Sequence, residues 1–184
     1  MLYAIGDLHL SFSNDKPMDV FGENWRDHAE KLKKGFSALT DEDVTVLCGD
    51  LSWAMGLEEA LEDFRFIEAL PGKKIILKGN HDYWWSTAAK AKKLFAENGI
   101  GSIEILHNNA FSYGDYALCG TRGWFFEEEH GMEHDKRSCA ARSCGSRHPC
   151  RRQESGTSSS FSTIRPFIRD TSAPRSWSFW SAMR

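Results

Sequence analysis

The chain has 184 residues, 41% hydrophobic and 12% aromatic, which is enough for one globular domain with a buried core. The net charge of −3 is unevenly distributed: residues 1–136 carry 14 basic and 24 acidic residues, whereas residues 137–184 carry nine Arg and two acidic residues. No apolar run approaches the roughly 20 residues that cross a bilayer, and no export signal is recognisable, so we expect a cytoplasmic protein with reduced thiols and no membrane partner.

Three short apolar runs, MLYAI at 1–5, VTVLC at 44–48 and KIILK at 74–78, predict buried strands. Between them, apolar residues recur at helical spacing over 25–39 and 57–70. Strands that alternate with helices predict parallel pairing, with helices on the faces of the sheet. The first part of the chain is therefore predicted to be an α/β unit.

A third helix is predicted over STAAKAKKLFAENG, residues 86–99, with Ser86 as its N-cap and Asn98-Gly99 as its stop signal. The segments that follow, GSIEILHN, AFSYGDY and ALCGTRGW, alternate short apolar runs with glycine-rich turns. They predict shorter strands, and we expect these to be antiparallel.

Polar clusters follow each of the first three predicted strands: GDLH, then GDLSW, then GNHD. In an open parallel sheet the carboxyl ends of the strands form one edge, where ligands bind, and neighbouring strands are about 4.8 Å apart. The clusters are therefore expected to converge. Together they supply Asp7, His9, Asp50, Asn80, His81 and Asp82.

Carboxylates, imidazoles and amide oxygens are ligands for Mn, Fe or Zn. Asp7 and His9 are two residues apart, and in extended backbone they would point the same way and reach one ion. Taken alone, an Asp after a strand is most often a turn or cap residue, and a single His is more often a satisfied polar group. Three clusters at three successive strand ends instead favour a shared metal site.

Two metal ions in such a site would form a clamp for attack on phosphorus. Asp50 would bridge the ions and Asn80 would complete the second. His81 would protonate the leaving alkoxide. Asp82 would hold the ring of His81 in one tautomer.

The same residues resemble a known family. GDLH, GDLSW and GNHD resemble the D-x-H, G-D and G-N-H-[DE] motifs of calcineurin-like metallophosphoesterases over about residues 1–125, and GNHDYWW is similar to a bacterial branch of predicted phosphohydrolases. The resemblance implies a four-layer α/β-β-α sandwich and two divalent ions (Mn, Fe or Zn). It implies hydrolysis of a phosphorylated small molecule or another phosphoester, mono- or diester, by a metal-activated water. By it, Asp7 and His9 bind the first metal, Asp50 bridges, Asn80 binds the second, and His81 assists catalysis.

The chain departs from the family after GNHD. The family pattern continues with a Gly-His pair and a final G-H-x-H, and none of the later histidines stands in such a setting; these are His107, His130, His134 and His148. We predict that residues 1–136 are the N-terminal half of the domain, with the later metal ligands missing. Weak or absent activity is therefore expected for the chain as written.

Residues 137–184 contain twelve Ser and nine Arg but no Leu, Val or Lys. A shifted reading frame joins the last base of each codon to the first two bases of the next. Translation in this frame is compatible with acidic amphipathic helices and with a His-Tyr-Pro-Pro sequence, where the family pattern expects its next histidine. We therefore predict a frameshift near residue 136 that leaves an aberrant, disordered tail. The alternative is a genuine Ser/Arg-rich disordered segment.

Two other functions remain open. The missing histidines would also suit a non-catalytic metal-binding remnant or scaffold protein. An Arg-rich tail can bind nucleic acid, but the acidic first 136 residues and the lack of a base-reading motif argue against it. Trp84, Trp85, Arg122 and Trp124 would either line a substrate pocket or pack locally, and the sequence identifies neither the substrate nor the oligomeric state.

Overall fold

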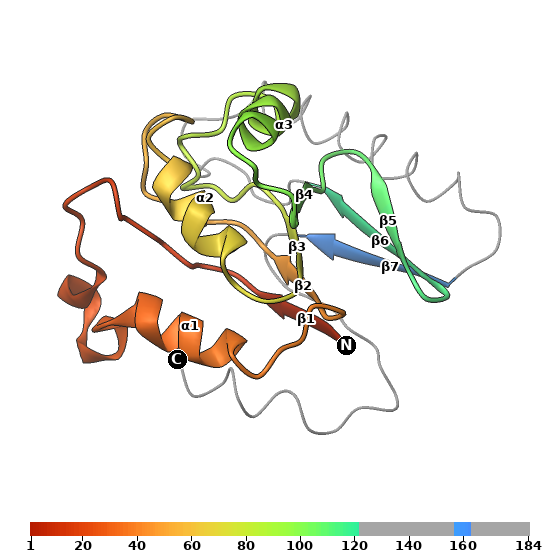
Figure 1. Ribbon diagram of the computed structural model, residues 1–184, viewed down its shortest axis with the longest axis horizontal. Helices are drawn as coiled ribbons and strands as arrows, with labels where there is room; N and C mark the ends of the chain where they lie inside the picture. Colours follow the sequence, from red (N-terminus) through yellow and green to blue (C-terminus); the bar gives the residue numbers. More distant parts are fainter. Residues whose placement is uncertain (122–156, 163–184) are drawn as a thin grey trace, which may run out of the picture.

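A computed structural model describes residues 1–121 and the backbone of residues 157–162, and Figure 1 shows its arrangement. Four strands form a parallel sheet in the order β1-β2-β3-β4. Their bounds are β1 Leu2–Ile5, β2 Val44–Leu47, β3 Lys73–Ile76 and β4 Ile103–Ile105. β1 and β2 lie within the predicted apolar runs, and β3 overlaps the third run but begins one residue before it and ends two residues before its end. β4 pairs with β3 in parallel, so the antiparallel prediction for this segment is wrong.

Three α-helices connect these strands and lie on one side of the sheet, as Figure 1 shows. They are α1 His28–Phe36, α2 Leu61–Glu68 and α3 Ala88–Glu97; two short 3-10 helices, η1 Met18–Phe21 and η2 Glu23–Trp25, precede α1. The main core cluster fills the space between helices and sheet, with fully buried Phe36, Phe64 and Ile76 among its members. The helical periodicity in the sequence thus predicted the apolar faces of α1 and α2 correctly.

The cap of α3 differs from the prediction. Thr87, one residue after Ser86, is the N-cap, and its side-chain oxygen accepts a hydrogen bond from the backbone N–H of Lys90. Thr87 has extended backbone angles, which an N-cap requires. Ser86 and Thr87 are both good capping residues, so local sequence alone did not separate them.

A second, smaller sheet covers the other face of the parallel sheet. It contains β5 Ala110–Tyr113, β6 Tyr116–Thr121 and β7 Thr157–Ser162. β5 and β6 form the predicted antiparallel hairpin, whose turn includes Gly114 with a positive φ of 56°. β7 pairs with β6 in parallel, within the segment for which the sequence predicted no strand.

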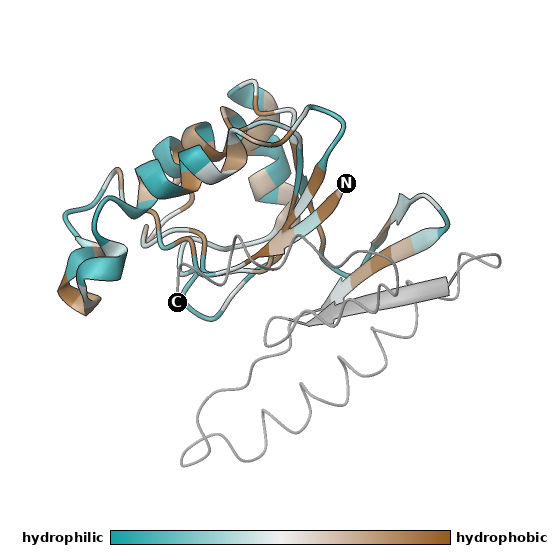
Figure 2. Cartoon of the chain, turned by 90° about the horizontal axis from the view of Figure 1, so that it is seen from below, coloured by the Kyte–Doolittle hydropathy of each residue, from teal (hydrophilic) through white to brown (hydrophobic). Residues whose placement is uncertain are grey.

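The two sheets enclose a second apolar cluster that includes Val46, Ile75, Leu106 and Leu118. Figure 2 shows hydrophobic positions on the strands of both sheets. The described residues therefore form three layers, helices, parallel sheet and smaller sheet, which matches part of the predicted α/β-β-α sandwich. Helices cover one face of the parallel sheet rather than both in this part of the chain. None of the described helices is long and apolar enough to cross a membrane.

Candidate metal centre

The loops that follow β1 and β2 run side by side at the carboxyl edge of the sheet. The backbone N–H of Asp7 donates to the carbonyl of Gly49 at 3.1 Å, and that of His9 donates to the carbonyl of Asp50 at 2.9 Å. The pairing ends in an isolated parallel bridge between Leu10 and Ser52. The first two polar clusters are thus joined by backbone hydrogen bonds, and their relative position is fixed.

Three motif residues have left-handed backbone: φ is 59° at Asp7, 46° at His9 and 54° at Asp50. Non-glycine residues rarely adopt such angles, and the strain is commonly found at functional sites. The expectation that Asp7 and His9 leave β1 in extended geometry is therefore wrong. Their side chains still approach each other, as the distance between Asp7 Oδ1 and His9 Nε2 below shows.

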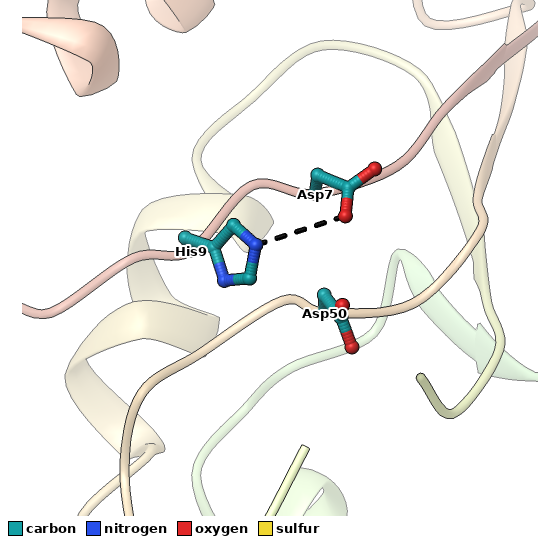
Figure 3. A group of neighbouring side chains, drawn as sticks. All are labelled: Asp7, His9 and Asp50. Atoms are coloured by element: carbon teal, nitrogen blue, oxygen red, sulfur yellow. Dashed lines mark ion pairs between the residues drawn. The ribbon is translucent and has the colours of Figure 1, made fainter. Parts of the chain in front are cut away.

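Asp7, His9 and Asp50 form a compact group of potential ligands (Figure 3). One ligand atom from each lies within 4.8 Å of those from the other two. Asp7 Oδ1 and His9 Nε2 are 3.7 Å apart, which is too long for a hydrogen bond; the two side chains form an ion pair only when the imidazole is protonated. The interaction with His9 lowers the pKa of Asp7, and burial opposes this shift. Asp7 is therefore held as a carboxylate, the form that binds a metal ion.

Aromatic side chains fix the ring of His9. The ring of Trp53 stacks on it with centroids 4.9 Å apart and planes 20° apart, and Trp25 contacts it edge-on at 6.0 Å. The Trp53 indole N–H in turn faces the sulfur of Met18 at 3.1 Å. Trp53 belongs to the GDLSW motif, in which only Asp50 was predicted to have a role at the site. The available signal for a role of Trp53 was its position two residues after the Asp50-Leu51 pair at the end of the second strand.

The third cluster approaches the second through glycines. A Cβ added to Gly49, which has a φ of 102°, would lie 2.6 Å from Cα of Gly79. A Cβ added to Gly79 would overlap the carboxylate of Asp50. The Gly in each of GDLSW and GNHD is therefore required by the backbone-to-backbone contact between the two loops.

His81 lies directly against Asp50. Its backbone N–H donates to Asp50 Oδ1 at 2.9 Å, and its ring Nδ1 is 3.1 Å from Asp50 Oδ2. The His81 side chain is 41% exposed, so it is held on one side and accessible on the other. The Asn80 amide nitrogen lies 3.1 Å from the same Nδ1, which places Asn80 beside His81 at the surface.

Asp82 differs from the predicted role, because its carboxylate contacts backbone groups and Trp84 rather than the ring of His81. It is 1% exposed. Its five donors are the backbone N–H groups of Gly79 (2.7 Å), Leu51 (2.8 Å), Asp50 (2.9 Å) and Ser52 (3.4 Å), and Nε1 of Trp84 (2.8 Å). Burial raises the pKa of Asp82, and these hydrogen bonds oppose the shift. Asp82 thus joins the second and third clusters by hydrogen bonds to the backbone of both loops.

Asp63 is another buried acid near the site, and the sequence did not predict a role for it. Asp63 of α2 accepts hydrogen bonds from the Ser52 hydroxyl and from the backbone N–H of Phe12. It ties the loops after β1 and β2 to the helix, and burial raises its pKa. Asp63 lies four residues before Ile67, on the buried face of the predicted helix, and that position was the available signal.

The aromatic residues after GNHD have separate locations. Trp84 is a core residue, packed edge-on against Phe64 at 4.8 Å. Trp85 lines a groove of about 770 Å³ together with Tyr83 and residues of α3. The remaining residues singled out in the sequence, Arg122, Trp124, His130, His134 and His148, lie outside the described residues.

Two carboxylates and one imidazole suit a divalent ion of the Mn, Fe or Zn type. The close spacing of the three ligand atoms and the ionised state of Asp7 both fit such an ion. Asp7, His9 and Asp50 would hold it.

The fold and the site define an α/β protein with metal-binding side chains at the carboxyl ends of adjacent parallel strands. The chain belongs to the calcineurin-like phosphoesterase family, whose sequence profile matches residues 2–181. The predicted resemblance is thereby confirmed. Membership implies metal-dependent hydrolysis of phosphoesters. The match extends over residues that we predicted to be an aberrant tail, and the frameshift itself stays a prediction.

Similarity to individual proteins is weaker. No curated protein matches the chain. A crystal structure of a protein of unknown function, AQ665 from Aquifex aeolicus, is similar over 77% of this chain and 70% of its own, with 20% identity and a TM-score of 0.44.

Proposed function

We propose that the protein hydrolyses phosphate mono- or diesters at a centre where Asp7, His9 and Asp50 hold a divalent ion and Asn80 contributes to a second. The observation that carries this is the group of three ligand atoms within 4.8 Å, supplied by two adjacent strand ends. Bound ions of this kind lower the pKa of water and neutralise charge on phosphoryl oxygens. The cytoplasmic location and the assignment of the ions as Mn, Fe or Zn stay predictions.

His81 is the proposed proton donor to the leaving oxygen. Its ring is held against Asp50 at 3.1 Å, while its partial exposure leaves it accessible to a substrate. A positioned imidazole contributes typically 10²–10⁴-fold to such proton transfers. Asp82 is proposed as a positioning residue: it acts through the backbone of Asp50 and Gly79, which it holds by hydrogen bonds.

The test compares metal content and turnover of the purified chain. Equilibrium dialysis against Mn should show bound metal, and a nitrophenyl phosphate should be hydrolysed slowly, because the later histidines of the family pattern are missing from the chain as written. Asp50→Asn should lose both properties, whereas His81→Gln should keep the metal and lose about 10²-fold or more in turnover. The matched controls are Asp115→Asn and His107→Gln, which lie outside the group. Metal binding without hydrolysis by the unmodified chain would instead favour the non-catalytic metal-binding protein.

A further inference from the structure

Trp53 contacts both histidines of the candidate site. Its ring stacks on His9 with centroids 4.9 Å apart, and it meets the ring of His81 at 5.5 Å with the planes 50° apart. The His9 and His81 rings are themselves 6.0 Å apart. Aromatic rings attract one another at centroid distances of about 4.5–7 Å, so the three rings form one packed group. Trp53 therefore touches a proposed metal ligand and the proposed proton donor at the same time.

The segment that follows β1 holds Trp53 in place. The side-chain amide of Asn14 donates to the backbone carbonyl of Trp53 at 3.2 Å, and the ammonium of Lys16 lies 5.1 Å from the centre of its ring. The indole N–H faces the sulfur of Met18, a buried residue, at 3.1 Å. The backbone N–H of Trp53 donates to the carbonyl of Leu10 at 2.9 Å. The backbone and the ring of Trp53 are therefore both fixed, as a residue that positions another side chain requires.

The His81 ring needs a contact of this kind. Its polar neighbours gather at Nδ1, where Asp50 Oδ2 and the amide nitrogen of Asn80 each lie at 3.1 Å. These contacts fix one ring atom, whereas the second side-chain torsion of a histidine has only broad preferences. Tyr83 also meets the ring edge-on at 6.1 Å, but Tyr83 is 52% exposed and Trp53 is half-buried. Trp53 is thus the better-anchored side chain that restricts rotation of the His81 ring.

We propose that Trp53 is a positioning residue for proton transfer, which holds the ring of His81 where it can reach the leaving oxygen of the phosphoester. The inference rests on the proposed function, in which His81 donates that proton. As the bond between phosphorus and the leaving oxygen breaks, the imidazolium proton passes to this oxygen, and the proton released by the attacking water restores the imidazolium through solvent. Trp53 takes no part in the bonds that change. Its contribution should grow with the basicity of the leaving oxygen, because a more basic oxygen depends more strongly on protonation.

Two substrates of similar shape separate this role from a structural one. Phenyl phosphate has a more basic leaving oxygen than nitrophenyl phosphate, because the nitro group withdraws electrons. In the full chain at saturating Mn, Trp53→Leu should lower kcat for phenyl phosphate by about 10–100-fold, the loss expected from a misplaced catalytic group, and change KM by less than about twofold. The loss of kcat for nitrophenyl phosphate should be at least about threefold smaller.

Two further variants give the reference points for Trp53→Leu. His81→Gln removes the proton donor, so it should also lower kcat more for phenyl phosphate than for nitrophenyl phosphate. Trp53→Phe keeps a flat ring beside His81, so its kcat should stay within about threefold of the unmodified chain for both substrates.

Phe66→Leu is the matched control, because it also replaces a half-buried ring by leucine. Among the described aromatic rings, Phe66 contacts Phe12 at 5.0 Å and neither histidine of the site. This variant should leave the ratio of the two kcat values unchanged. If Trp53→Leu lowers the midpoint of urea unfolding but keeps that ratio, Trp53 is merely structural and the proposal is wrong. Equal losses for both substrates would also overturn it, since Trp53 would then act through His9.

A second measurement requires neither turnover nor a stable variant. NMR relaxation of the metal-free full chain gives an order parameter for each imidazole ring. The His81 ring should have a value near that of rigid backbone, about 0.85, and a value below about 0.6 in the unmodified chain would overturn the proposal whatever the rates are. The value should fall in Trp53→Leu and stay unchanged in Phe66→Leu.

Failure of the positioning role differs from failure of the proposed function. Hydrolysis of both substrates with a mobile His81 ring, or with the same kcat ratio in Trp53→Leu, would refute the positioning role and leave the phosphoesterase assignment intact. An unmodified, Mn-loaded chain that hydrolyses neither substrate would refute the assignment and the positioning role together.

Discussion

Replacement of Asp82 by Asn should separate the two loops that carry the candidate site. Oδ2 of Asp82 accepts the backbone N–H groups of Asp50 and Gly79, and Oδ1 accepts those of Leu51 and Ser52 and the indole of Trp84. An Asn side chain has one acceptor oxygen. If it occupies the place of Oδ1, its NH2 group faces two backbone donors that then have no acceptor.

The expected cost follows from those two lost contacts. A buried donor without a partner costs about 1–3 kcal/mol, so the loss of two acceptors in Asp82→Asn should lower the free energy of unfolding by about 2–6 kcal/mol. A chain of this size shifts its melting temperature by about 2–4 °C for each kcal/mol, which gives a decrease of roughly 4–24 °C. This is a large share of the total stability of a typical domain, about 5–15 kcal/mol.

Urea unfolding measures the free energy, and amide hydrogen exchange locates the change. The amides of Asp50 and Gly79 should exchange faster in Asp82→Asn, and Mn affinity should fall because Asp50 loses its position. Asp115→Asn, at an exposed site, should change stability by less than about 0.5 kcal/mol. If Asp82→Asn unfolds within about 0.5 kcal/mol of the unmodified chain, the hydrogen-bond argument is wrong.

Three further predictions follow from other contacts. Gly79→Ala should prevent folding or lower the free energy of unfolding by about 3 kcal/mol or more, because the new Cβ would overlap the Asp50 carboxylate. Gly101→Ala, with open space around the added Cβ, should be nearly neutral, and equal unfolding midpoints for the two variants would contradict this. Lys74→Met should lower the free energy of unfolding in urea by about 1–3 kcal/mol, because the buried ammonium of Lys74 donates to two backbone carbonyls near the end of α2. A gain in stability would mean that the cost of desolvating the ammonium outweighs these hydrogen bonds. The terminal ammonium and the backbone N–H of Thr40 lower the pKa of Asp43 to about 2 from 3.8, so the contribution of this carboxylate to stability is present above pH 4 and is lost as pH falls towards 2. The unfolding midpoints of Asp43→Asn and the unmodified chain should therefore differ at pH 5 and converge near pH 2. A difference that stays constant with pH would refute this prediction.

The sequence by itself determined the first three strands, the helices between them and the edge at which the polar clusters meet. Short apolar runs followed by Gly-Asp or Gly-Asn are local signals. The burial of an apolar face stabilises a strand or helix strongly enough to make hydrophobic periodicity a reliable predictor of these elements. The grouping of Asp7, His9 and Asp50 followed from the same logic, since parallel strands end at one edge.

Only the tertiary structure decided the roles of individual side chains. Whether β4 is parallel depends on which strand edge is free, and that is a property of the assembled sheet. Asp82 follows His81 directly, so proximity along the chain suggested a contact with its ring; the donors that Asp82 binds instead come mostly from the loop after β2, some 30 residues earlier. The left-handed turns at Asp7, His9 and Asp50 likewise depend on the backbone contacts between the two loops, which local patterns do not encode.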